Sequence, residues 1–143
     1  MNSLMVGLGG FIGANLRYWA GIIIPAKGAL PITLFINIIG ALLIGLVSGW
    51  AMKSAPNPQL VLFLKVGLCG GFTTFSSFSL EAWQMIESGK YALAVVYCVL
   101  SVILCIAAVV MGESLVKYMV NVYVAVFAVT PVQSAHVAPS ALN

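Results

Sequence analysis

Charged residues are scarce in this sequence. Only 6% of the 143 residues are Asp, Glu, Lys or Arg, and 62% are hydrophobic, whereas soluble domains carry about 25% charged residues. So few charges cannot keep a folded surface in water, and we therefore expect an integral membrane protein in contact with lipid. The net charge of +3 is spread singly along the chain. It forms no basic patch, so nucleic acid is not an expected partner.

Side chains that usually bind metals or perform acid–base chemistry are also scarce. The chain has three cysteines and one histidine. The cysteines lie in apolar runs without a Cys-x-x-Cys pair, as small buried side chains do. The three glutamates and the distal His136 supply no nucleophile–base pair, so we expect no enzyme. The N-terminal region lacks a basic segment followed by a cleavage site, so we expect no signal peptide.

Four stretches are long and apolar enough to span a bilayer, which takes about 20 residues. They cover residues 4–24, 32–52, 60–86 and 91–111, and segments with Pro, Gly, Lys or Asn separate them. The sequence thus predicts an all-α membrane protein whose four transmembrane helices form one domain over residues 1–118. We expect residues 119–143 to be a C-terminal tail that is partly disordered, because the apolar run within it is too short to span.

The middle of the third stretch is poor material for a continuous helix. Gly70 and Gly71 are closely followed by five hydroxyl residues within seven positions, and residues of these types weaken helices. A broken helix at membrane depth is tolerated only where the freed backbone is buried in protein or lines a cavity. We expect two half-helices joined by an irregular segment at about residues 70–76, with an ion or substrate site beside it.

Pairs of glycines four residues apart occur in the first two stretches, at Gly9 and Gly13 and at Gly45 and Gly49. This spacing lets two helix backbones approach closely, so we expect helix packing at both pairs. The segment Gly7-Leu-Gly-Gly-Phe-Ile-Gly13 also resembles a dinucleotide-binding fingerprint. That motif needs a preceding strand, and here it lies inside an apolar span.

The cations favour neither orientation in the membrane. With the N-terminus inside, three fall on each side: Lys53, Lys65 and Lys117 inside, and Arg17, Lys27 and Lys90 outside. The positive-inside rule depends on the difference between the sides, which is zero. Either the tie is chance in a chain with few charges, or the chain inserts both ways up and forms an antiparallel homodimer. Four helices are too few to enclose much of a pore, which also favours a dimer.

Two polar side chains lie inside otherwise apolar spans. Arg17 either reaches the membrane interface with its long side chain or attracts anions to a pore mouth. Asn37 must find hydrogen-bond partners in lipid. Its amide either bonds to a neighbouring helix or donates to a permeating anion while the protein holds its carbonyl end.

Phe75 and Phe78 are three residues apart, so they share one face if the second half-helix begins near them. Aromatic rings have a positive edge. Two such edges beside serine and threonine hydroxyls would form a weak anion-binding surface, which suits conduction. Packing is the ordinary role of phenylalanines at this spacing and stays an alternative. Backbone carbonyls freed at the break are ligands for hard cations such as sodium.

These residues alone leave three functions open: a channel, a small secondary transporter coupled to protons or sodium, and an assembly subunit without transport. The first stretch holds no acidic residue. The coupling chemistry of small drug/proton antiporters, which use a membrane-embedded glutamate there, therefore cannot operate.

The motifs together resemble the Fluc/CrcB family of fluoride channels. The resemblance covers about residues 4–115 and is carried by the following segments: Gly9-Gly-Phe-Ile-Gly-Ala-Asn-Leu-Arg-Tyr18, Asn37-Ile-Ile-Gly40, Gly67-Leu-Cys-Gly-Gly-Phe-Thr-Thr-Phe-Ser-Ser-Phe-Ser-Leu-Glu81 and Tyr97-xxx-Ser101. It implies a dual-topology antiparallel homodimer in the plasma (inner) membrane of the cell. Such a dimer has two pores that pass fluoride passively out of the cell and relieve fluoride toxicity.

The resemblance also implies roles for individual residues. The fluoride pathway would comprise Asn37, Phe75, Ser76, Ser77, Phe78, Tyr97 and Ser101, with Arg17 near the aqueous vestibule. Asn37 would donate to fluoride, and the two phenylalanines would line its path. A structural sodium ion at the centre of the dimer interface would be bound by the main-chain carbonyls of Gly70 and Thr73 from both subunits.

Overall fold

The computed structural model describes residues 1–24 and 30–128, and every regular element within these ranges is a helix. The elements are α1 (Asn2–Ile23), α2 (Ile32–Ser54), α3 (Pro58–Val61), the π-helical η1 (Leu62–Cys69), α4 (Gly70–Phe72), α5 (Phe75–Glu87) and α6 (Tyr91–Ala128). The predicted all-α class is therefore confirmed.

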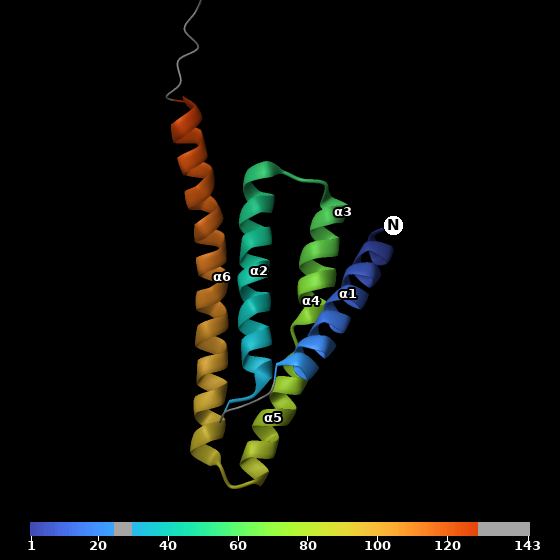
Figure 1. Cartoon of the computed structure of the whole chain (residues 1–143), viewed down its shortest axis with the longest axis vertical. Coiled ribbons are helices and arrows are strands. Elements are labelled where there is room, and N and C mark those ends of the chain that lie inside the picture. Colours follow the sequence, from blue (N-terminus) through green and yellow to red (C-terminus); the bar gives the residue numbers. More distant parts are fainter. Residues whose placement is uncertain (25–29, 129–143) are drawn as a thin grey trace, which may run out of the picture.

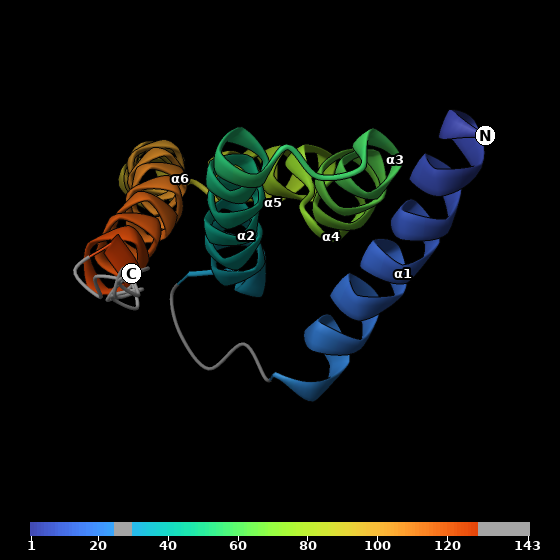
Figure 2. The same cartoon turned by 90° about the horizontal axis from the view of Figure 1, so that it is seen from above.

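The helices follow one another in an open, curved row. Seen from above, α6, α2, the segment from α3 to α5, and α1 succeed each other from one side to the other (Figure 2). The most extensive packing joins α2 to α6 and α1 to η1. Most large apolar side chains stay exposed, including Phe11, Ile103 and Val110. A single chain thus leaves wide apolar surfaces for lipid or for other protein.

Glycines lie where the helices approach most closely. A Cβ added to Gly9 or Gly13 would overlap backbone atoms of η1 and α4, and one added to Gly45 would overlap the α6 backbone at Val109. Gly49 is in a similarly tight position against α6. The predicted helix packing at both glycine pairs is confirmed.

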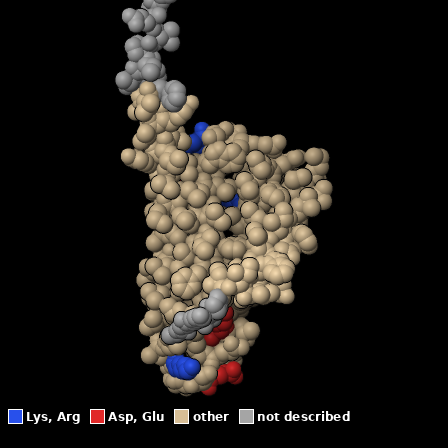
Figure 3. Space-filling model, in the orientation of Figure 1, with Lys and Arg blue, Asp and Glu red and all other residues tan. Residues whose placement is uncertain are grey.

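Within the described ranges, three segments are long and apolar enough to cross a membrane: Ile32–Ser54, Pro58–Glu87 and Tyr91–Val126. The first predicted span corresponds to α1, whose composition is less apolar because it contains Asn15, Arg17 and several glycines. Its 22 residues extend about 33 Å, enough to cross a hydrocarbon core of about 30 Å. Charged side chains are sparse over most of the face shown in Figure 3 and occur mainly towards its two ends.

The third segment is broken, as predicted, but the irregular part is shorter than expected. Helical geometry continues from Pro58 through Phe72, and only Thr73 (ψ 158°) and Thr74 (φ −149°) are extended before α5 begins. The expectation that Gly70 and Gly71 unwind was wrong. A Cβ on Gly71 would come within 2.6 Å of the Gly10 carbonyl oxygen, so this glycine serves the close approach of α1.

Helix α6 is longer than predicted. It passes the expected end of the span at residue 111 and the expected domain boundary at residue 118, and it continues to Ala128, the last described residue. After Gly112 no glycine or proline follows until Pro131, so nothing in the sequence stops the helix earlier. The rest of the predicted tail, residues 129–143, lies outside the described residues.

Candidate ion site at the helix break

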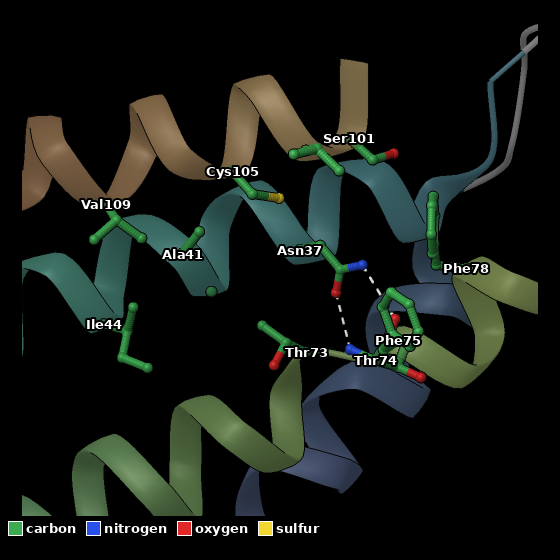
Figure 4. A pocket seen from close by; sticks show the side chains of 12 residues that line it. Asn37, Ala41, Ile44, Thr73, Thr74, Phe75, Phe78, Ser101, Cys105 and Val109 are labelled. Atoms are coloured by element: carbon green, nitrogen blue, oxygen red, sulfur yellow. Dashed lines mark hydrogen bonds between the residues drawn. The ribbon is translucent and has the colours of Figure 1, made fainter. Parts of the chain in front are cut away.

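Asn37 of α2 holds both backbone groups of Thr74 at the break. Its Nδ2 donates to the Thr74 carbonyl at 3.1 Å, and the Thr74 N–H donates to its Oδ1 at 2.8 Å (Figure 4). In a continuous helix the Thr74 N–H would bond to the carbonyl of Gly70. Asn37 therefore replaces a helical hydrogen bond, and the second hydrogen of its amide stays available to another acceptor.

Thr74 is also the N-cap of α5. Its Oγ1 accepts from the Ser77 N–H at 3.2 Å, and the same hydroxyl lies 3.2 Å from Ser76 Oγ and donates to Ser77 Oγ at 3.1 Å. An N-cap of this type satisfies one of the free N–H groups of the first turn. Three hydroxyls are thereby gathered at the positive end of the α5 dipole.

The end of the first half-helix is bound by different groups. Arg17 of α1 donates from Nε to the carbonyl of Gly71 at 3.3 Å, and both the N–H and the hydroxyl of Thr73 donate to the carbonyl of Cys69 at 3.0 Å. A cation at the C-terminal end of a helix interacts favourably with the helix dipole. The break thus brings a helix C-terminus held by Arg17 next to the N-terminus of α5.

A cavity of about 340 Å³ opens beside the break (Figure 4). Its polar lining comes from Asn37, Thr73, Thr74 and Ser101, and its aromatic lining from Phe75 and Phe78. The two ring centroids are 5.4 Å apart with an interplanar angle of 41°. Phe78 also packs on Tyr97 at 5.1 Å, whereas Phe75 is 78% exposed in the single chain.

A second cavity, of about 460 Å³, also borders the break. Arg17, Thr33 and Ser77 line it together with Thr74, which is therefore shared by both cavities. This cavity combines a guanidinium group with hydroxyls, and it is more polar in character than the first.

Glu81 joins three helices below the break. Its Oε1 accepts from the hydroxyl of Thr33 on α2 at 2.6 Å, and its Oε2 accepts from the hydroxyl of Tyr97 on α6 at 2.6 Å. Thr33 and Tyr97 are buried, so both hydroxyls need an acceptor inside the protein. We did not predict Thr33 as part of the site. Its only signal in the sequence was a hydroxyl near the start of an apolar span.

The structure brings most of the predicted residues together and separates a few. Asn37, Phe75, Phe78 and Ser101 line the smaller cavity, and Arg17 and Ser77 line the larger one. Ser76 and Tyr97 line neither of these two spaces, since Ser76 is exposed beside Thr74 and Tyr97 is buried behind Phe78. The hydroxyl of Ser101 donates to the carbonyl of Tyr97 at 2.7 Å within α6.

A broken helix beside two cavities, in a chain of long apolar helices, defines a multi-pass membrane protein with a candidate ion site at the break. This chain belongs to the CrcB family. The family model described as CrcB-like protein, Camphor Resistance (CrcB), matches residues 4–113, and the resemblance seen in the sequence motifs is thereby confirmed.

Curated relatives cover most of the chain. It is 45% identical to the Fluoride-specific ion channel FluC of Ruminiclostridium cellulolyticum, over 82% of this chain and 93% of that protein. It is 46% identical to the protein of the same name from Erythrobacter litoralis, over 80% and 91%. It is 43% identical to that from a Methylobacterium species, over 82% and 98%.

Proposed function

We propose that this chain forms a fluoride-specific ion channel that lets fluoride leave the cell passively across the plasma membrane and so relieves fluoride toxicity. The curated relatives are named fluoride-specific ion channels. The structural observation that supports it is the convergence of neutral donors at the break. The relatives are named channels, in agreement with the prediction that the chain is not an enzyme.

A small, strongly hydrated anion needs several donors that replace its water at once. The free hydrogen of the Asn37 amide and the hydroxyls at the α5 N-terminus offer such donors, and the helix dipole adds a positive end. The edges of Phe75 and Phe78 add weak positive potential. None of these groups carries a full charge, so an anion that enters can also leave, as conduction requires.

Within this proposal each predicted residue has a place. Asn37, Phe75 and Phe78 contact the ion in the smaller cavity, and Ser101 contributes at its α6 wall. Ser76 and Ser77 contribute hydroxyls at the α5 N-terminus. Arg17 serves the larger cavity as a vestibule, where its charge attracts anions. Tyr97 does not contact the ion but positions Phe78, because it packs on the Phe78 ring and is itself hydrogen-bonded to Glu81.

We further propose an antiparallel homodimer with two pores, built from chains inserted both ways up. The even division of the cations supports it, with Lys27 outside the described residues. Exposure of Phe75 to 78% also supports it, since a pore wall formed by one chain leaves this ring uncovered. The open row of helices likewise needs a second surface to enclose a pathway (Figure 2).

The carbonyls of Gly70 and Thr73 fit the proposed structural sodium ion. Because the Thr74 N–H bonds to Asn37, the Gly70 carbonyl lacks its usual helical donor. Thr73 has an extended conformation, so its carbonyl does not take part in the hydrogen bonding of the helix. Carbonyl oxygens suit a hard cation, and Gly70 is exposed in the single chain, where a second copy can add the same two oxygens. Bound sodium would hold the two breaks together.

Fluoride efflux from vesicles tests the function. Purified protein is reconstituted into vesicles loaded with fluoride and chloride, and a fluoride electrode and a chloride electrode follow their release. We expect fluoride to leave and chloride to stay. Uphill fluoride movement driven by a proton or sodium gradient would instead support a secondary transporter, and silence from folded protein would contradict both.

A further inference from the structure

Helix α6 extends well past the helix on which it packs. Gly45 of α2 lies against Val109 of α6, and Gly49 lies against Glu113. The two helices run in the same direction (Figure 1). In this register the end of α2 at Ser54 lies about level with Tyr118, and α6 continues beyond it to Ala128. The last turns of α6 therefore have no neighbouring helix of the described chain beside them.

The helix is also longer than a bilayer is thick. Its 38 residues extend about 57 Å, whereas the hydrocarbon core measures about 30 Å and the bilayer with headgroups about 40–45 Å. Lys117 forms an i, i+4 ion pair of 3.0 Å with Glu113 and is the last charged residue of the sequence. A helix that left the membrane at Lys117 would place Tyr118–Ala128 in water.

The composition of these turns does not suit water. Tyr118, Met119, Val122, Val124 and Val126 are all exposed, by 42% to 69%. At about 100° per residue, four of these positions lie within an arc of about 100° and Val124 lies on the far side of the helix. Asn121, which is also exposed, lies between Val124 and Tyr118. A single partner helix would cover one face and leave the others wet. Lipid covers all faces, and the exposed apolar surface of α6 at Val95, Val102 and Ile106 runs continuously into this segment.

We propose that Tyr118–Ala128 is a lipid-contacting extension, embedded at the boundary between acyl chains and headgroups, so that the membrane contact of α6 does not end at Lys117. A tilt of about 40° would bring the axial extent of α6 to about 44 Å, within the full bilayer. Tyr118 has the amphipathic ring that is typical of this zone. The segment lies beyond residues 4–113, which the family model matches, so family membership does not assign it a role.

The lipid class follows from the charges. The extension carries no Lys or Arg, so it cannot attract anionic headgroups as basic interfacial helices do. Contact rests on apolar burial and should be equal in vesicles of phosphatidylcholine alone and in vesicles with added phosphatidylglycerol. Salt should not weaken it, because no ionic contact to lipid is involved.

Spin labels at single cysteines test the proposal in the full-length protein. In a background with Cys69, Cys98 and Cys105 replaced by alanine, labels are placed at Val122→Cys and Val124→Cys, which lie about 200° apart on the helix. Val99→Cys on the same helix is the lipid reference, and Asn57→Cys in the α2–α3 connection is the water reference. Collision of each label with oxygen and with a water-soluble nickel chelate is measured in phosphatidylcholine vesicles.

We expect both test labels to collide more with oxygen than with nickel, as the Val99 label does, and to differ from the Asn57 label. Nickel-dominated collision at both positions would overturn the proposal in favour of a helix in water. Shielding of one label from both reagents would overturn it in favour of a protein partner on that face.

A second measurement uses the unmodified protein, so its outcome does not depend on folding of the cysteine variants. Vesicles contain a phospholipid with a photoreactive diazirine near the top of its acyl chain, and mass spectrometry locates the adducts after illumination. We expect adducts within 118–128. Labelling of residues 95–110 without labelling of 118–128 would overturn the proposal. Fluoride efflux is followed separately, so a non-conducting protein with a labelled extension would contradict only the channel function.

Discussion

Asn37 and Thr74 are joined by two hydrogen bonds, one to the carbonyl of Thr74 at 3.1 Å and one from its N–H at 2.8 Å. These bonds connect α2 to the point where the third segment leaves helical geometry. At membrane depth neither backbone group has water as an alternative partner. Asn37 therefore stabilises the break, and in the proposed channel it also presents its remaining N–H to fluoride.

Replacement of Asn37 by alanine tests this double role. Asn37→Ala leaves two backbone groups of Thr74 unpaired, and each should cost about 1–3 kcal/mol of stability. We expect a lower midpoint temperature for loss of the folded elution peak and fluoride efflux at the background rate.

Asn15→Ala is the matched control. The Asn15 amide bonds only to the Phe11 carbonyl of its own helix, at an exposed position, so its removal should change neither midpoint nor efflux. Wild-type efflux and midpoint in Asn37→Ala would contradict both roles of the amide.

Glu81→Gln should destabilise the contact between α2, α5 and α6. Thr33 and Tyr97 both donate to the carboxylate at 2.6 Å. A glutamine offers one carbonyl oxygen, and its NH2 group faces a hydroxyl that has lost its acceptor. We expect a loss of about 1.5–3 kcal/mol, the range for hydrogen bonds to charged groups, measured as a drop in the thermal midpoint. Glu87→Gln, at the exposed end of α5, should leave the midpoint unchanged.

Gly40→Ala should disturb the break without removing any polar group. A Cβ on Gly40 would overlap Cγ2 of Thr73 and lie 3.4 Å from the Phe72 ring, so Thr73 must shift. We expect fluoride efflux to fall by about tenfold or more, which corresponds to roughly 1.4 kcal/mol. A Cβ on Gly7 meets no atom of the described chain within 4 Å, so Gly7→Ala should conduct normally. Equal efflux from both variants would show that the position of Thr73 does not control conduction.

Phe78→Ile should abolish conduction and leave assembly intact. Isoleucine keeps apolar bulk beside Phe75 and Tyr97 but has no aromatic edge to offer an anion. We expect background fluoride efflux from a protein with an unchanged elution volume. Phe11→Ile, on an exposed face of α1, is the control with the same change in side chain. Normal fluoride efflux from Phe78→Ile would show that the Phe78 ring serves packing alone and does not contact the ion.

Much of the fold was predictable because each signal is local. Apolar length predicted the helical segments, and the hydroxyl-rich stretch after Gly71 predicted a break close to its observed position. The extent of the break was not predictable, since Gly71 has a helical conformation and its small size serves the approach of Gly10. A glycine looks the same in sequence whether it unwinds a helix or lets another helix come near.

The hydrogen-bond partners of the polar side chains could not be predicted from the sequence, because they are set by which residues lie close in space. An amide in an apolar run must be satisfied, and this much about Asn37 followed from its position alone. Thr74 is 37 positions away, and only the packing of α2 against the break makes it the partner. The same holds for Glu81, whose two donors come from different helices.

The sequence by itself determined that the protein lies in a membrane, that it is helical, and to which family it belongs. The scarcity of charge, the length of the apolar stretches and the short motifs that show these properties are all present in the chain as written. Only the tertiary structure decided which backbone groups bond to Asn37, that Thr33 and Tyr97 donate to the same carboxylate, and that α6 extends past the end of its neighbour α2. These depend on how far each helix extends and on which faces meet, and the energy that selects them comes from contacts between residues far apart in the chain.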